Sequence, residues 1–112
     1  MIIKPNNEDD IKKLLESNQL ILLDFYADWC EPCKWLDIIL VEVDTLLDEN
    51  LLIVKIDIEI TPKMAKAYNI QSLPVLCLIK EKKILWRMNG FLTADQLTKK
   101  IKSISRETSI VD

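Results

Sequence analysis

Two cysteines lie three positions apart in the stretch "ADWCEPCKW" (residues 27–35), as Cys30 and Cys33 with Glu31 and Pro32 between them. Three kinds of site use this spacing: half of a zinc centre, a short structural disulfide, and a reactive dithiol. A structural zinc site takes four Cys or His ligands, but the chain has no histidine and three cysteines in all. A disulfide closing so short a loop gains little loop entropy. The composition therefore favours a reactive dithiol, and we expect no metal.

The reactivity of this pair depends on where the next helix begins. Apolar residues recur at helical spacing after the motif and predict a helix from Cys33 to about Asp48, which places Cys30 at its N-terminus. Unpaired backbone N–H groups and the helix dipole favour a thiolate there. We therefore expect Cys30 to be the nucleophile that attacks a client disulfide. Cys33, one turn further in, is expected to be the more buried thiol that resolves the mixed disulfide.

The remaining elements must place this helix against a sheet. Strands are predicted over residues 2–4, 20–26, 51–58, 75–80 and 84–88, and further helices within residues 6–17, 61–69 and 93–104. Only residues 81–83 separate the last two strands, too few for a parallel crossover, so an antiparallel hairpin is expected. The order β-α-β-α-β-α-β-β-α predicts an α/β fold, a central mixed sheet with helices on both faces.

Length and charge limit the classes of protein. A chain of 112 residues with 49% hydrophobic content suits one domain, residues 1–112. A net charge of -3 with scattered lysines gives no electrostatic reason to expect nucleic-acid binding. No apolar run approaches the roughly 20 residues of a membrane span, and the start of the chain turns acidic too early for a secretory signal. The odd number of cysteines favours a reducing compartment, and we expect the cytoplasm.

One carboxylate is unusual on its sequence context alone. Asp24 lies among Leu22, Leu23 and Phe25 in a predicted buried strand. A carboxylate that loses its hydration there has a raised pKa and exchanges protons near neutral pH. The alternative is an aspartate exposed at the end of the strand.

Three features in order resemble the thioredoxin family: "LLDFYADWCEPCKW" (residues 22–35), the proline of "IQSLPV" and the single glycine of "RMNGF". The resemblance covers essentially the whole chain. It implies the thioredoxin fold and an enzyme that reduces disulfides in client proteins. It also implies no bound cofactor, because reducing equivalents would come from NADPH through a separate thioredoxin reductase. We expect a cytoplasmic monomer that serves electron transport and cell redox homeostasis.

The resemblance also implies roles around the dithiol. Asp24 would help to deprotonate Cys33, and Lys55 would lie beside Asp24 and favour its charged form. Trp29 would shape the client-binding surface, and Pro32 would set the start of the helix. A solvent-facing Lys55 and a core Trp29 are the alternatives.

The remaining implied residues bind the client. Pro74 matches the family's cis-proline, which would face the dithiol and leave the Leu73 backbone free to pair with an extended peptide. Gly90 would form the opposite lip, and as the chain's only glycine it is expected to need unusual dihedral angles. Cys77, in a predicted strand, is interpreted as a buried structural residue.

Two departures from the family pattern affect the predicted specificity. Glu31 replaces the usual glycine inside the motif, and Ile38 replaces a proline that kinks the helix in many relatives. Two rival functions stay open. One is a thioredoxin-fold binding or chaperone module with incidental redox activity, and the other is an exported disulfide oxidant or isomerase.

Overall fold

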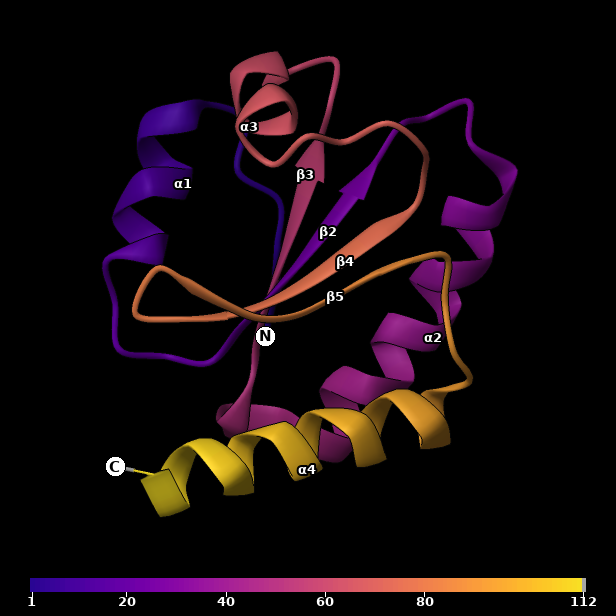
Figure 1. Ribbon diagram of the computed structural model, residues 1–112. Helices are drawn as coiled ribbons and strands as arrows, with labels where there is room; N and C mark the ends of the chain where they lie inside the picture. Colours follow the sequence, from indigo (N-terminus) through magenta and orange to yellow (C-terminus); the bar gives the residue numbers. More distant parts are fainter. Residues whose placement is uncertain (112) are drawn as a thin grey trace.

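A computed structural model describes the backbone of residues 1–111 and the side chains of residues 1–107 (Figure 1). The strands are β1 (Ile2–Ile3), β2 (Ile21–Tyr26), β3 (Leu52–Asp57), β4 (Val75–Lys80) and β5 (Lys83–Asn89). The helices are α1 (Glu8–Leu15), α2 (Glu31–Leu47), a short 3-10 turn η1 (Asp48–Asn50), α3 (Pro62–Ala67) and α4 (Ala94–Val111). The predicted element order is confirmed.

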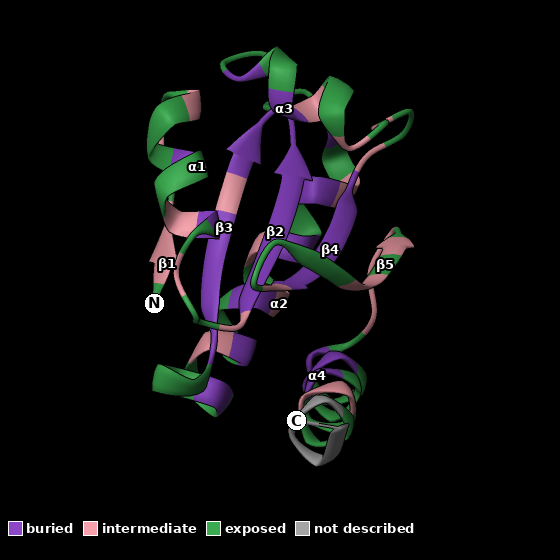
Figure 2. Ribbon diagram, turned by 60° about the vertical axis from the view of Figure 1, so that its left-hand side comes forward, coloured by how far each residue is buried: buried purple, intermediate pink, exposed green. Residues whose placement is uncertain are grey.

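The five strands form one mixed sheet in the order β1-β3-β2-β4-β5. Strands β1, β3 and β2 are parallel, while β4 runs antiparallel to β2, and β5 antiparallel to β4. Strand β2 therefore lies at the centre, and its residues are buried throughout (Figure 2). This explains its near-continuous apolar sequence, because both of its faces are covered.

Helices cover both faces, as expected (Figure 1). One core combines Ile11 of α1 and Met64 of α3 with strand residues such as Phe25. The other core combines residues of α2 and α4, such as Leu40 and Leu97, with strand residues whose side chains point to the other side of the sheet. Side chains alternate along a strand, so Asp24 points to the same side of the sheet as Leu22, which is the side that α2 covers.

The hairpin between β4 and β5 differs from the prediction. Its loop has two residues, Glu81 and Lys82, because Lys83 already pairs with Lys80. Both loop residues have positive φ, 51° and 67°. That is the backbone of a type I′ turn, which normally selects Asn-Gly, so the sequence lacks the usual signal for so tight a loop.

The start of α4 has a side-chain cap, and the start of α3 does not. Thr93 and Gln96 make the reciprocal capping-box hydrogen bonds at the start of α4. Thr61 occupies the position before α3, but its hydroxyl donates to the Asp57 carbonyl and does not cap the helix. Within residues 1–111, no helix combines the length and the apolar character required to cross a membrane.

Candidate active site

The two cysteines lie just after the end of β2, at the start of α2. Cys30 is the N-cap residue of α2. The helix begins at Glu31, two residues before the predicted start at Cys33, because Glu31 and Pro32 already belong to it. The Cys30 Sγ accepts a hydrogen bond from the Cys33 backbone N–H at 3.3 Å. This is the environment that stabilises a thiolate at a helix start. The prediction that Cys30 occupies the N-terminus of the helix is confirmed.

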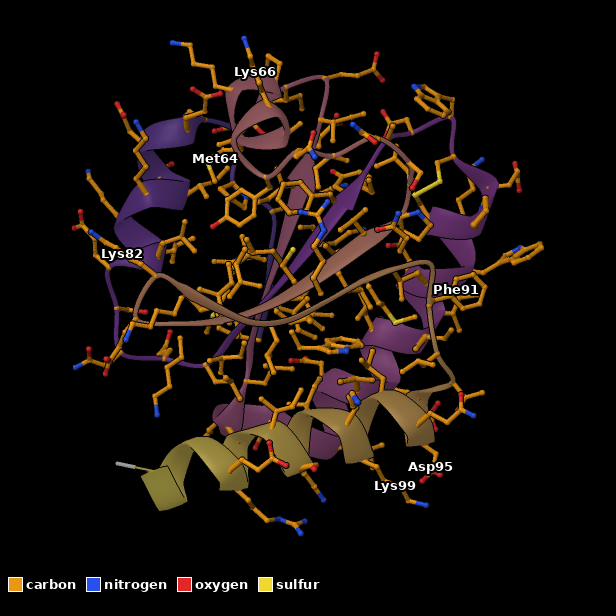
Figure 3. The ribbon with its side chains drawn as sticks, in the orientation of Figure 1. Met64, Lys66, Lys82, Phe91, Asp95 and Lys99 are labelled. Carbon is orange, nitrogen blue, oxygen red and sulfur yellow. A yellow bond between two sulfur atoms is a disulfide. The ribbon has the colours of Figure 1, made fainter. Side chains whose placement is uncertain are left out.

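The two cysteines are joined as a disulfide, with their Cα atoms 5.3 Å apart. It is the yellow bond near the start of α2 in Figure 3. Cys30 is 5% exposed and Cys33 2%, so Cys33 is the more buried of the pair, as expected. The structure therefore shows the oxidised state of the motif.

A groove of about 420 Å³ opens beside Cys30. Its walls come from the start of α2 and from the segment that precedes β4: Trp29, Cys30, Glu31, Pro32, Ile58, Ile70, Gln71, Ser72 and Leu73. Trp29 is 67% exposed, so it belongs to the surface, and the alternative of a core aromatic is wrong. The groove is mostly apolar and can accept an extended chain next to the disulfide.

The segment opposite the dithiol contains a cis peptide bond between Leu73 and Pro74, as the resemblance implied. The Gly90 N–H donates to the Pro74 carbonyl at 2.8 Å and ties the end of β5 to this loop. Gly90 has φ of 99°, which confirms the expected unusual dihedral angle. A Cβ at this position would meet nothing within 4 Å, so the backbone conformation and not crowding requires glycine.

Asp24 is fully buried on the α2 face of β2, and the alternative of an exposed aspartate is wrong. Neither of its carboxylate oxygens has a hydrogen-bond partner among the described residues. Burial raises the pKa of Asp24 to about 7; Lys55 opposes this increase and Asp37 adds to it. The group can therefore hold or release a proton near neutral pH.

Lys55 pairs with Asp24 in the register of β2 and β3, so the predicted proximity is confirmed. Its ammonium, however, donates a hydrogen bond to the Asp37 carboxylate of α2. It also lies 4.5 Å from the centre of the Tyr26 ring. The Lys55 side chain is 12% exposed, so the alternative of a solvent-facing lysine is wrong. The pair between Lys55 and Asp37 was not predicted, because no local sequence pattern relates residues 18 positions apart.

Glu31 is exposed at the first turn of α2, and its carboxylate accepts a hydrogen bond from the Lys34 ammonium at 3.3 Å. The structure places a cation beside Glu31, so the charge that it adds next to Cys30 is partly balanced.

Cys77 lies on β4 in the core that α1 and α3 cover, on the opposite face of the sheet from the dithiol. Burial raises the pKa of its thiol, which disfavours a reactive thiolate. No group of three or more His, Cys, Asp or Glu side chains among the described residues is arranged to hold a metal ion.

These features give a Cys30–Cys33 disulfide at a helix N-terminus, a groove beside Cys30, and a buried protonatable carboxylate, Asp24, on the α2 face of the sheet. Such a site defines the class of thiol–disulfide oxidoreductases. Comparison with known proteins supports this class. The Thioredoxin family model matches residues 2–103. The chain belongs to the thioredoxin family.

Several curated relatives are similar over most of this chain. A thioredoxin-like protein of Synechocystis sp. is 38% identical over 101 residues, covering 90% of this chain and 96% of its own. Thioredoxin Y2, chloroplastic, of Arabidopsis thaliana is 41% identical over 98 residues, covering 88% of this chain. The chain spans 58% of the length of thioredoxin Y2 and 51% of thioredoxin Y1 from the same plant.

Solved thioredoxin structures have the same fold. A chloroplastic thioredoxin z has a TM-score of 0.80 at 28% identity, covering 95% of this chain and 98% of its own. A mutant thioredoxin from Halobacterium salinarum has a TM-score of 0.79 at 28% identity, covering 92% of this chain and 89% of its own. The predicted α/β thioredoxin fold is confirmed.

Proposed function

We propose that this protein reduces disulfides in client proteins with Cys30 as nucleophile and Cys33 as resolving thiol. The observation that carries the proposal is the Cys30–Cys33 pair at the start of α2, with the groove beside it. A client segment lying in the groove would place its disulfide against Cys30. The Leu73 backbone, just before the cis-proline, is suited to pair with that segment as a short added strand.

The reaction proceeds in two exchanges. The Cys30 thiolate attacks one client sulfur, the client S–S bond breaks, and the other client sulfur leaves as a thiolate that takes up a proton. Cys33 then passes its proton to the Asp24 carboxylate and attacks Cys30. A Cys30–Cys33 bond forms, the mixed disulfide breaks, and the departing client thiolate takes up the second proton. The client has gained two electrons and two protons, and the protein is left in the oxidised state of the structure.

Regeneration of the dithiol requires two electrons from another protein. We assign this step to a separate thioredoxin reductase that draws on NADPH, with no cofactor bound to this chain, and we propose that the chain acts as a monomer. Mixing the oxidised protein with NADPH and a thioredoxin reductase tests whether such a reductase regenerates the dithiol. Loss of NADPH absorbance is expected, and no loss with any reductase tried would contradict this assignment.

A reducing compartment fits the buried free thiol of Cys77. The cytoplasm stays our proposal for the location. The chloroplastic thioredoxins among its relatives make a plastid the second candidate. Fractionation of cells of the source organism followed by immunodetection would separate the two.

Insulin reduction in the presence of dithiothreitol tests the proposed activity. Wild type is expected to accelerate the reaction, Cys30→Ser to give the rate of dithiothreitol alone, and Cys77→Ala to behave as wild type. The Cys77 variant controls for loss of a thiol elsewhere in the fold. A wild-type rate equal to that of dithiothreitol alone would leave a binding or chaperone module as the better description.

A further inference from the structure

An unusual feature of the α2 face is that a buried carboxylate and a nearby ammonium group do not pair with each other. Asp24 and Lys55 are register partners on β2 and β3. Yet the Asp24 oxygens have no hydrogen-bond partner among the described residues, while the Lys55 ammonium bonds to Asp37. Asp37 lies four residues after Cys33 on α2.

Two contacts fix the position of the Lys55 ammonium. The Asp37 carboxylate accepts its hydrogen bond from the α2 side, and the Tyr26 ring lies 4.5 Å from it on the sheet side. Solvation explains why Asp37 is the preferred partner. Its side chain is 46% exposed and keeps much of its hydration in the pair, whereas Asp24 is fully buried. Pairing with Asp24 would require both charges to be desolvated.

We propose that Asp37 is a positioning residue for the dithiol reaction: it holds the Lys55 ammonium away from Asp24, so that Asp24 stays unpaired and carries the proton that Cys33 must lose. Asp37 acts through Lys55 and does not touch the reacting sulfurs. The inference rests on the proposed reduction of disulfides for its consequence, but the arrangement of the three side chains stands on the structure alone.

The charged groups around Asp24 are few. Lys55 comes from β3 and Asp37 from α2, and Tyr26 is the titratable group on β2 itself. Strand β4 places the apolar Leu76 opposite Asp24. Because Lys55 favours the ionised form of Asp24, moving its ammonium closer would make the carboxylate a weaker base. Asp37 therefore keeps Asp24 able to accept a proton near pH 7.

Asp37→Asn tests the inference, because the amide keeps the shape of the side chain and removes its charge. The ionisation of Asp24 is followed by the ¹³C chemical shift of its carboxyl group in the oxidised protein, in which neither Cys30 nor Cys33 titrates. The chain has no histidine to titrate in the same pH range. The Asp24 midpoint is expected to fall by about one pH unit. The pH profile for release of a peptide trapped on Cys30 should move with it.

Matched variants separate positioning from direct charge. Asp37→Glu should restore the midpoint, and Glu42→Gln, the same change of charge on an exposed position of α2, should leave it unchanged. In a Lys55→Gln background the effect of Asp37→Asn should shrink to less than half, because only the direct repulsion between the two carboxylates remains.

Several results would overturn the inference: an unchanged or higher midpoint in Asp37→Asn, no restoration by Asp37→Glu, an equal fall in the Lys55→Gln background, or an equal fall in Glu42→Gln. The titration gives its answer even if wild type fails to reduce insulin. Failure of the proposed function and failure of this inference are therefore distinguishable.

Discussion

On the face of the sheet that α1 and α3 cover, the buried strand residues are apolar, among them Phe25 and Cys77. The face that α2 and α4 cover also has a large apolar core, but toward the carboxyl end of β2 it holds Asp24, Lys55 and the dithiol. Both faces belong to the same strands. The second face combines a core that stabilises the fold with a buried carboxylate, whereas the buried strand residues of the first face are all apolar.

The cysteines show what this difference means for reactivity. Cys77 and Cys33 are both buried, at 0% and 2% exposure. Only Cys33 has a disulfide partner, and only its side of the sheet holds Asp24, a buried strand carboxylate with a raised pKa. Burial and residue type alone therefore do not distinguish the two cysteines, whereas their positions in the fold do.

The sharpest test of that difference is Cys33→Ser. This variant can form the mixed disulfide through Cys30 but cannot resolve it, so catalytic turnover should be lost and a covalent complex with the client should accumulate. Non-reducing electrophoresis followed by mass spectrometry detects the complex. Cys77→Ser should trap nothing, and a complex that disappears as fast as with wild type would contradict the role of Cys33.

On the apolar face, Phe25→Ala should destabilise the fold by about 3–5 kcal/mol at every pH, because it leaves a cavity in the α1 and α3 core. Phe25 is 0% exposed, and its ring lies 5.3 Å from that of Tyr68. Urea unfolding at pH 5 and pH 8 measures the loss. Trp35→Ala is the control, since Trp35 is 59% exposed and contacts Phe91 edge-on, and it should cost about 1 kcal/mol or less. Equal losses for the two variants would contradict the assignment of Phe25 to the core.

The adjacent residue on the other face should show the opposite sign and a dependence on pH. Asp24 has a pKa of about 7 in the folded protein against 3.8 for an aspartate exposed to water, so the folded state binds the proton more tightly. Ionisation therefore removes stability as pH rises from about 4 to 7, by a total of about 4 kcal/mol. Asp24→Asn lacks this penalty.

Urea unfolding of Asp24→Asn and wild type across pH 4–8 measures that dependence. The difference in stability should grow in favour of the variant as pH rises and should level off above pH 7. Glu42→Gln provides the control for loss of an exposed carboxylate, for which the difference should be flat. A flat difference for Asp24→Asn as well would show that Asp24 is not a buried acid.

The smallest effect is expected for Glu31, the exposed residue next to Cys30. Glu31→Gly removes a carboxylate next to Cys30, so the thiolate should form at slightly lower pH, with a change of roughly twofold in its fraction because the pair with Lys34 is exposed. Thiolate absorbance during a pH titration measures it. Lys34→Gln should move the curve the other way, and a shift of the Glu31 variant to higher pH would contradict the reasoning.

Much of the fold could be predicted from periodicity. Asp24 could be identified because it is a charged residue among the apolar residues Leu22, Leu23 and Phe25. The cis bond before Pro74 came from family resemblance, because local sequence gives no such signal.

Other features depend on tertiary structure. The contact between Asp37 and Lys55 exists because α2 packs across β3 at a particular rotation, which helical spacing alone does not define. The two-residue hairpin was missed because Glu81 and Lys82 are not the residues that its positive φ angles normally select. Tertiary pairing of β4 with β5 overrides that local preference.

The register between β2 and β3 places Leu22, Asp24 and Tyr26 beside Ile53, Lys55 and Asp57. Side chains alternate along a strand, so a slip of β2 by one residue would turn Asp24 into the apolar core and move Phe25 out of it. A chain misaligned in this way would lose its packing and its proton carrier together. The register that packs the central strand is therefore also the register that places Asp24 on the α2 face, so alignment of β2 and placement of the carboxylate depend on each other.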